Sequence, residues 1–132
     1  MEKIEFTEFE DDRGKLIAIE NFGNCPFQMK RIFYIYDVPI GQHRGRHCHL
    51  KAHQLILCIK GYLSISVDDG ISTSNFLLDN PKQGLHVPPM HWTNLLEFST
   101  DSIVLVLASE VYDVNDYILD FEDFKSRKLS DI

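Results

Sequence analysis

The sequence predicts an all-β domain, folded as a sandwich or a small barrel. Two observations predict it: short alternating or apolar runs recur along the whole chain, and clear turn signals separate them. Asp69-Gly70 is a strong hairpin signal, because this pair readily adopts the positive φ angles of a type I′ turn. The chain shows neither a repeat nor an interdomain linker, so we expect residues 1–132 to form one domain.

The expected strands are the runs between these turns, at residues 4–9, 15–20, 31–37, 47–60, 63–67, 72–78, 84–87 and 103–107. A short helical or extended segment should follow them at residues 112–124, where Ile118, Phe121 and Phe124 have i, i+3 spacing and Asp113 is a suitable N-cap. Its apolar face is expected to pack on the barrel, and the rest of the chain is expected to be a frayed tail.

Composition and charge exclude several classes of protein. The net charge of −7 disfavours nucleic-acid binding, which needs a basic surface to neutralise phosphates. We read no secretory signal in the acidic start, and no stretch approaches the roughly 20 apolar residues that span a bilayer. Cys25, Cys48 and Cys58 are odd in number and lack CxxC spacing, so we expect neither disulfides nor a zinc site. These features predict a cytoplasmic protein without nucleic-acid or membrane partners.

The densest functional signal lies between Gly41 and Gly61. In a strand, side chains two apart share a face, so His47 and His49 should point the same way. The first cupin motif has the same spacing as five residues of this chain: Gly41, His47, His49, Gln54 and Gly61. The resemblance predicts a double-stranded β-helix, or jelly-roll barrel, whose interior can hold one small ligand with both histidines at its mouth.

A metal site is the obvious reading of this motif, but the ligands are incomplete. Many cupins bind a divalent metal through the two histidines, a Glu where this chain has Gln54, and a third histidine where it has Thr93. A neutral amide is a poor ligand for such a cation. His86 and His91 lie near the third position and leave its register open. We expect no metal and no other cofactor.

Without a metal, His47 and His49 can act as general acid and base, because imidazole titrates near neutral pH. Such a pair suits proton removal at a carbon next to a carbonyl, where an enediolate must be stabilised. Arg44 and Lys51, in the only dense basic patch, are candidates to bind the substrate or its negative charge. Gln54 is a further substrate-binding candidate.

Three more residues are predicted to bind substrate. Arg31 shares an otherwise apolar strand face with Phe33, and a buried guanidinium needs an anionic partner such as a carboxylate or phosphate. Tyr36 lies on the opposite face of the same strand, where an aromatic side chain is either core or a ligand contact. Trp92 follows a Pro-Pro turn and either stacks on a nucleobase or plugs the barrel end. Cys48, out of phase with the histidines, should point outward.

Four segments together carry a more specific resemblance. They are the RGRHCH run at residues 44–49, the apolar run at 54–61, VPPMHW at 87–92 and YDVNDYILDF at 112–121. The chain resembles the sugar 3,4-ketoisomerases that act on dTDP-4-oxo-6-deoxyglucose, over nearly its whole length. Two departures are Cys48 and Leu50, where that family usually has Ala and Lys.

The resemblance implies a metal-independent isomerase that moves a ketone from C4 to C3 of a dTDP-linked 6-deoxyhexose, for synthesis of 3-amino-3,6-dideoxy sugars. It implies that His47 and His49 are the acid and base, and that Arg44 contacts the substrate or its phosphates. It also implies a homodimer that exchanges N-terminal strands, so that residues 4–9 pair with the partner subunit.

Two other functions stay open. A nucleotide-sugar 3,5-epimerase also uses a metal-free jelly roll, although its family is longer and pairs its base with a Tyr-Asp arrangement that the sequence does not reveal. A metal-dependent cupin, acting as a dioxygenase or a small-molecule sensor, requires tightly bound metal. Deuterium incorporation and metal analysis distinguish these alternatives.

Overall fold

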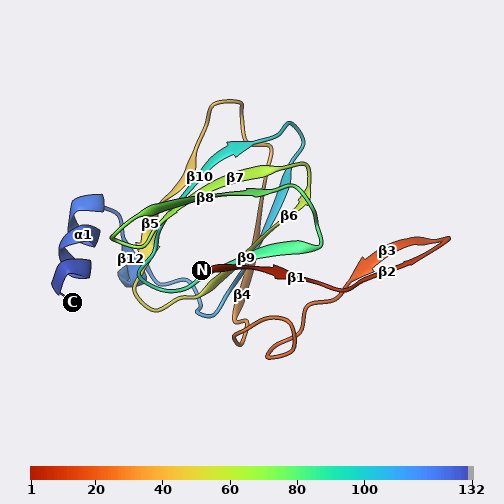
Figure 1. The fold of residues 1–132 in the computed structure, drawn as a ribbon, viewed down its shortest axis with the longest axis horizontal. Coiled ribbons are helices and arrows are strands. Elements are labelled where there is room, and N and C mark those ends of the chain that lie inside the picture. Colours follow the sequence, from red (N-terminus) through yellow and green to blue (C-terminus); the bar gives the residue numbers. More distant parts are fainter. Residues whose placement is uncertain (131–132) are drawn as a thin grey trace.

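The computed structural model describes residues 1–130, which form two facing β-sheets and a C-terminal α-helix (Figure 1). The strands are β1 Glu2–Glu5, β2 Glu8–Asp11, β3 Gly14–Ile17, β4 Arg31–Tyr36, β5 Arg44–His49, β6 Gln54–Lys60, β7 Leu63–Asp68, β8 Thr73–Leu78, β9 Gln83–Val87, β10 Trp92–Phe98, β11 Ile103–Ala108 and β12 Tyr117–Ile118. A 3₁₀ turn, Val114–Asp116, precedes β12, and helix α1 spans Phe121–Ser130.

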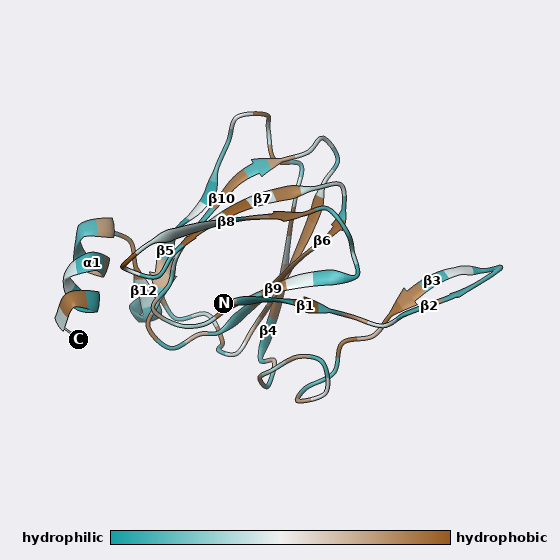
Figure 2. Ribbon diagram, in the orientation of Figure 1, coloured by the Kyte–Doolittle hydropathy of each residue, from teal (hydrophilic) through white to brown (hydrophobic). Residues whose placement is uncertain are grey.

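The two sheets have five strands each, in the orders β1-β9-β6-β11-β4 and β12-β5-β10-β7-β8. All their strand pairs are antiparallel, and the sheets enclose an apolar interior that Figure 2 shows as brown strands facing one another. β7 shows the cause most clearly, because Leu63, Ile65 and Val67 are buried while the residues between them are partly exposed. The predicted all-β jelly roll is confirmed.

Most of the predicted strands are present, but several of their boundaries are wrong. The expected strand 47–60 is two strands, since the chain turns at residues 50–53 between β5 and β6. β10 was missed because its pairing with β7 shifts register between Leu95 and Glu97, which breaks the alternation of buried and exposed residues.

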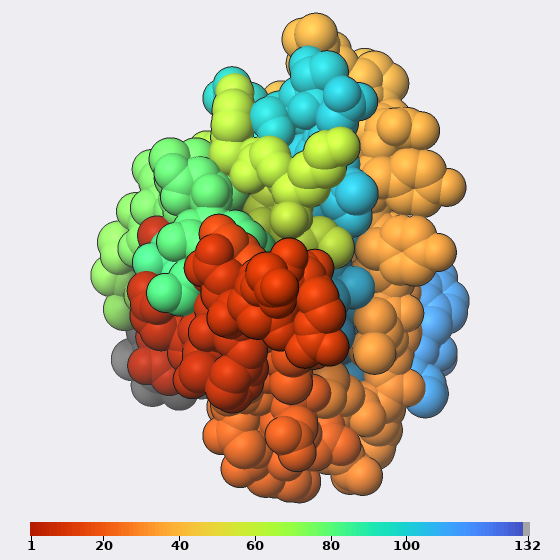
Figure 3. All heavy atoms as spheres, turned by 90° about the vertical axis from the view of Figure 1, so that its right-hand side faces the viewer, coloured from red at the N-terminus to blue at the C-terminus, as the bar shows by residue number. Residues whose placement is uncertain are grey.

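The N-terminal segment divides into two parts. β1 pairs with β9 of the same chain, from Glu2 opposite His86 to Glu5 opposite Gln83. β2 and β3 form a separate two-stranded sheet that projects from the barrel, at the end opposite α1 (Figure 1). Figure 3 looks onto this end, where the red and orange N-terminal residues stand out toward the viewer.

The C-terminal segment corrects a prediction. Residues 112–124 are not one helix, because Asp113 caps only the short 3₁₀ turn by accepting a hydrogen bond from Asn115 N–H. α1 begins later, and its residues 125–130 are helical rather than frayed; residues 131–132 lie outside the described part. Phe124 is the buried anchor of α1 on the barrel. None of the helical segments in residues 1–130 has the length and apolar content to cross a membrane.

Candidate active site

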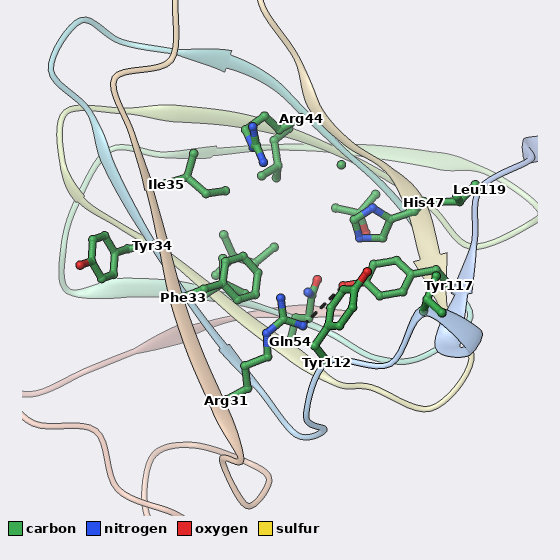
Figure 4. A pocket seen from close by; sticks show the side chains of 16 residues that line it. Arg31, Phe33, Tyr34, Ile35, Arg44, His47, Gln54, Tyr112, Tyr117 and Leu119 are labelled. Carbon is green, nitrogen blue, oxygen red and sulfur yellow. Dashed lines mark hydrogen bonds between the residues drawn. The ribbon is translucent and has the colours of Figure 1, made fainter.

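A cavity of about 460 Å³ opens inside the barrel, between the two sheets (Figure 4). Its floor is apolar and includes the core side chains Ile56, Leu95 and Val106. The segment between β11 and α1 closes one side with Tyr112 and Tyr117. A few polar groups therefore converge on an apolar pocket, which is the usual form of a small-molecule site.

A bulge in β5 places the first histidine in this cavity. Gly45 has φ +88° and Arg46 has φ +60°, and the pairing of β5 with β10 shifts register at this point. A Cβ at residue 45 would lie 2.9 Å from the carbonyl oxygen of Thr93, so only glycine fits the close approach of the two strands. The bulge aims the His47 ring into the cavity.

His49 lies behind His47 rather than on the cavity wall. The two rings meet edge to face, with centroids 4.9 Å apart. His47 lines the cavity, whereas His49 is only 7% exposed and does not. The predicted shared strand face is present, but only one of the two rings is within reach of a ligand in the cavity.

Asp116 holds His49 in place. Its Oδ2 lies 3.1 Å from His49 Nδ1, and its two carboxylate oxygens also accept hydrogen bonds from the Lys51 and Ala52 backbone N–H groups, at 2.7 and 3.3 Å. Because a carboxylate is only an acceptor, His49 donates from Nδ1 and keeps its lone pair on Nε2. Nε2 is buried and has no hydrogen-bond partner among residues 1–130.

Both histidines are held in the neutral form. Burial, with a smaller contribution from nearby His49, lowers the pKa of His47 to about 4. Burial also lowers the pKa of His49, although the hydrogen bond to Asp116 opposes this shift. At neutral pH the His47 ring is therefore an unprotonated base facing the cavity.

Arg31 and Tyr117 complete the polar wall. Arg31 Nη1 donates a long hydrogen bond of 3.4 Å to the Tyr117 hydroxyl, drawn as a dashed line in Figure 4. The Tyr117 ring packs against both histidines, with centroid distances of 5.0 Å to His47 and 4.4 Å to His49. Asp116 and Tyr117 had not been identified from the sequence as site residues, although both belong to the YDVNDYILDF run.

The cavity brings together four of the predicted site residues: His47, Arg44, Arg31 and Gln54. Thr93, at the expected position of a third metal ligand, lines it as well. These residues come from four strands, β4, β5, β6 and β10. Their roles in catalysis or substrate binding stay predictions.

Tyr36 and Lys51 do not line this cavity, and their roles in substrate binding stay predictions. Tyr36 is on the opposite face of β4 from Arg31, and 58% of its surface is exposed. Lys51 is an exposed residue of the turn after β5, and its contact with the site is made by its backbone N–H.

Trp92 is also outside the cavity, and its ring is buried against α1. Its ring centroid lies 5.3 Å from that of Phe121 and 5.9 Å from that of Phe124. Of the two roles predicted for Trp92, closing the end of the barrel therefore fits better than stacking on a nucleobase. Cys48 faces away from the cavity as predicted, but it is fully buried beside Trp92 rather than exposed. Helix α1 covers the outer face of β5, which the sequence alone suggested would be exposed to solvent.

The other candidate metal ligands point elsewhere. His86 Nε2 lies 3.0 Å from His53 Nδ1, and these two rings stack. His91 Nδ1 donates to the Pro89 carbonyl. Within residues 1–130, no group of three or more His, Cys, Asp or Glu side chains is placed to hold a metal ion.

The family of the chain follows from comparison with known proteins. Residues 1–129 match the family described as "FdtA: WxcM-like, C-terminal". A TDP-4-oxo-6-deoxy-alpha-D-glucose-3,4-oxoisomerase of Aneurinibacillus thermoaerophilus is 41% identical over 122 residues, which are 92% of this chain and 88% of that protein. The chain belongs to this family, and the resemblance to sugar 3,4-ketoisomerases is confirmed.

Solved structures agree. The crystal structure of QdtA, a sugar 3,4-ketoisomerase of Thermoanaerobacterium thermosaccharolyticum, in complex with TDP is 32% identical, with a TM-score of 0.96 over 99% of this chain and 96% of that one. A His-to-Asn variant of the same enzyme has been solved with TDP-4-keto-6-deoxyglucose, at 32% identity and a TM-score of 0.95 over 98% of this chain and 94% of that one.

The rmlC epimerase of Mycobacterium tuberculosis is a more distant neighbour. It is 20% identical, with a TM-score of 0.74 over 87% of this chain and 66% of that one, which shows a shared fold. Asp116 and Tyr117 lie beside the histidines, a placement that the sequence alone did not reveal. Membership of the ketoisomerase family is the stronger reason to prefer isomerisation.

Proposed function

We propose that this protein is a sugar 3,4-ketoisomerase that converts TDP-4-oxo-6-deoxy-D-glucose into a TDP-3-oxo-6-deoxyhexose. The observation that carries the proposal is the neutral His47 ring in the cavity, backed by His49 and Asp116. Full-length matches to enzymes of this activity support it. Such a product feeds the synthesis of 3-amino-3,6-dideoxy sugars.

The substrate has an anionic diphosphate and a neutral sugar, and the cavity offers a place for each. QdtA binds TDP and, as a variant, TDP-4-keto-6-deoxyglucose. Arg44 is an exposed cation at the cavity wall, suited to the solvent-facing diphosphate. The sugar is then directed inward, with C3 toward His47, and Gln54 is available to hydrogen-bond a hydroxyl.

The reaction leaves the composition of the sugar unchanged. His47 takes the proton from C3, and the C–H electron pair forms a C3=C4 double bond while the C4 carbonyl becomes an O4 enolate. The O3 proton moves to O4, and C3 becomes the ketone. The electron pair of the C3=C4 double bond then takes a proton at C4 from the protonated His47 ring, which has exchanged with solvent, and His47 is neutral again. Asp116 orients the His49 ring, and the His49 ring in turn packs edge to face against His47 and fixes its position.

Three matched histidine variants test the assignment. His47→Asn should lower turnover by at least 10³-fold, roughly the loss expected for a general base with its oriented partner. His49→Asn should lower it strongly as well, while TDP affinity and fold stay close to wild type. His43→Asn is the control, because His43 is exposed, does not line the cavity, and has its Nδ1 hydrogen-bonded to Arg46. Full activity in both His47→Asn and His49→Asn would overturn the mechanism.

We also propose that the protein is a homodimer. β4 is an edge strand, and its outer side chains Ile32, Tyr34 and Tyr36 are all more than half exposed. The projecting β2–β3 hairpin adds exposed Phe9 and Leu16, and an isolated hairpin is only marginally stable in water. A second copy would cover both surfaces.

The exchanged element in this proposal is the β2–β3 hairpin rather than the whole of residues 4–9, because β1 pairs within its own chain. Sedimentation velocity should give twice the chain mass of 15.3 kDa. Tyr34→Glu combined with Tyr36→Glu should give monomers, since a charge on each outer ring opposes burial. Leu129→Glu, on exposed α1, is a control that should leave the dimer intact. A monomeric wild type would contradict the proposal.

Two smaller expectations complete the proposal. We infer that residues 1–132 form one domain, supported by a family match that runs from residue 1 to 129. A cytoplasmic location fits the three cysteines, Cys25, Cys48 and Cys58, which are free thiols in the structure.

A further inference from the structure

Arg31 lines the cavity and has no acidic partner among residues 1–130. Its guanidinium lies 4.6 Å from the Phe33 ring centroid and 5.2 Å from that of Tyr112. None of the ion pairs among residues 1–130 includes it. Aromatic faces compensate a half-buried guanidinium only in part, so the site is built to receive an additional acceptor.

Tyr117 extends this donor group toward the base. Its hydroxyl oxygen accepts from Arg31 Nη1, so the hydroxyl proton is free to be donated to another acceptor. Its ring meanwhile contacts the His47 ring. The structure thus places two hydrogen-bond donors, the Arg31 guanidinium and the Tyr117 hydroxyl, close to His47, which removes the C3 proton.

Resting on the proposed ketoisomerase function, we propose that Arg31 and Tyr117 are catalytic residues that bind O3 and O4 of the sugar and stabilise the enediolate. The ring keeps O3 and O4 on the same side of the C3=C4 double bond, so both oxygens face one direction. A planar guanidinium presents paired N–H groups in a fork that matches two adjacent oxygens.

The fork also fits the course of the reaction. Negative charge develops first on O4, when the C3–H electron pair enters the ring, and passes to O3 when the O3 proton moves to O4. A donor that contacts both oxygens stabilises each form without moving. A lysine, as a single point charge, follows this shift less well.

Burial argues against a diphosphate role for Arg31. Arg31 is half-buried between two aromatic rings, whereas Arg44 is exposed and lies well apart from it in Figure 4. A diphosphate joined to a solvent-facing nucleoside should bind at the exposed cation, Arg44. The half-buried cation, Arg31, is then available to bind the sugar oxygens.

The test separates turnover from nucleotide affinity. Arg31→Gln should lower kcat by about 10²- to 10³-fold, the usual effect of losing one donor to a developing oxyanion, with the Kd for TDP, from calorimetry, within about twofold of wild type. Arg31→Lys should keep part of the activity. Arg44→Gln is the contrasting variant and should mainly weaken TDP binding.

Tyr117→Phe tests the second donor with almost no change in shape. It should lower kcat about tenfold, the free-energy equivalent of one lost neutral hydrogen bond, again with unchanged TDP affinity. Equal losses of kcat/KM and TDP affinity in Arg31→Gln would make Arg31 a diphosphate ligand and overturn the inference, as would normal kcat in Arg31→Gln and Tyr117→Phe. Failure of the proposed function itself is a separate result, namely a wild-type protein that moves no ketone.

Discussion

Asp116→Asn is the sharpest perturbation of the catalytic pair. Asp116 is buried, and Oδ2 lies opposite both His49 Nδ1 and the Ala52 N–H. Asparagine can keep the Lys51 bond through its oxygen, but its NH₂ group then meets the Ala52 N–H, donor against donor. The same NH₂ group forces His49 to accept at Nδ1 and to carry its proton on Nε2.

The structural cost follows from these lost bonds. A hydrogen bond to a charged group and an unsatisfied buried N–H together amount to about 3 kcal/mol, which for a domain of this size corresponds to a fall in Tm of roughly 10 °C. The change in tautomer should lower kcat on the order of 10²-fold, less than for a residue that orients the base directly, because His49 does not line the cavity. KM should stay within about threefold.

Three measurements check this prediction. Imidazole ¹⁵N NMR should show the His49 proton moving from Nδ1 to Nε2, while thermal unfolding and steady-state kinetics give the losses in Tm and kcat. Asp113→Asn is the matched control, because Asp113 is exposed and Asn also caps a turn well. An unchanged His49 tautomer with kcat within twofold of wild type would refute the role assigned to Asp116.

The remaining predictions concern pH, backbone and metal. The pKa of His47 is lowered from 6.5 to about 4, so its contribution to stability is complete above pH 6.5 and is lost as pH falls toward 4. Between pH 7 and 4.5, the free energy of unfolding in urea should fall by about 2 kcal/mol more for wild type than for His47→Asn. Equal losses would argue against a neutral buried ring. Gly45→Ala should lower the free energy of unfolding by about 1–3 kcal/mol, since its Cβ meets Thr93, whereas Gly23→Ala, with ordinary contacts, should be nearly neutral. Because the motif supplies an amide at Gln54 and a hydroxyl at Thr93, dialysis against EDTA should change kcat less than about twofold; a loss restored by added metal would favour the metal-dependent alternative.

Local spacing explains which parts of the site could be predicted. The strand period of two is enough to place His47 and His49 on one face, and to separate Arg31 from Tyr36. That period does not say which face is inside. Arg31 and Tyr36 were both predicted to bind substrate, yet they lie on opposite faces of β4, and of these two only Arg31 lines the cavity.

Long-range contacts explain what was missed. Asp116 reaches His49 across 67 residues of sequence, from an irregular 3₁₀ turn that carries no periodic pattern. Trp92 is buried by a helix whose start depends on Asp120, which accepts from Glu122 N–H, and not on the expected cap. Such packing partners are set by topology, and one sequence shows them only through a resemblance to a whole family.

Ketone migration tests the central claim most directly. Purified wild-type protein is incubated with TDP-4-oxo-6-deoxyglucose in D₂O, and the sugar is followed by ¹H and ¹³C NMR. The account predicts that the carbonyl signal moves from C4 to C3 and that deuterium enters at C4. A carbonyl that stays at C4, with deuterium at C5, would contradict it and identify an epimerase instead.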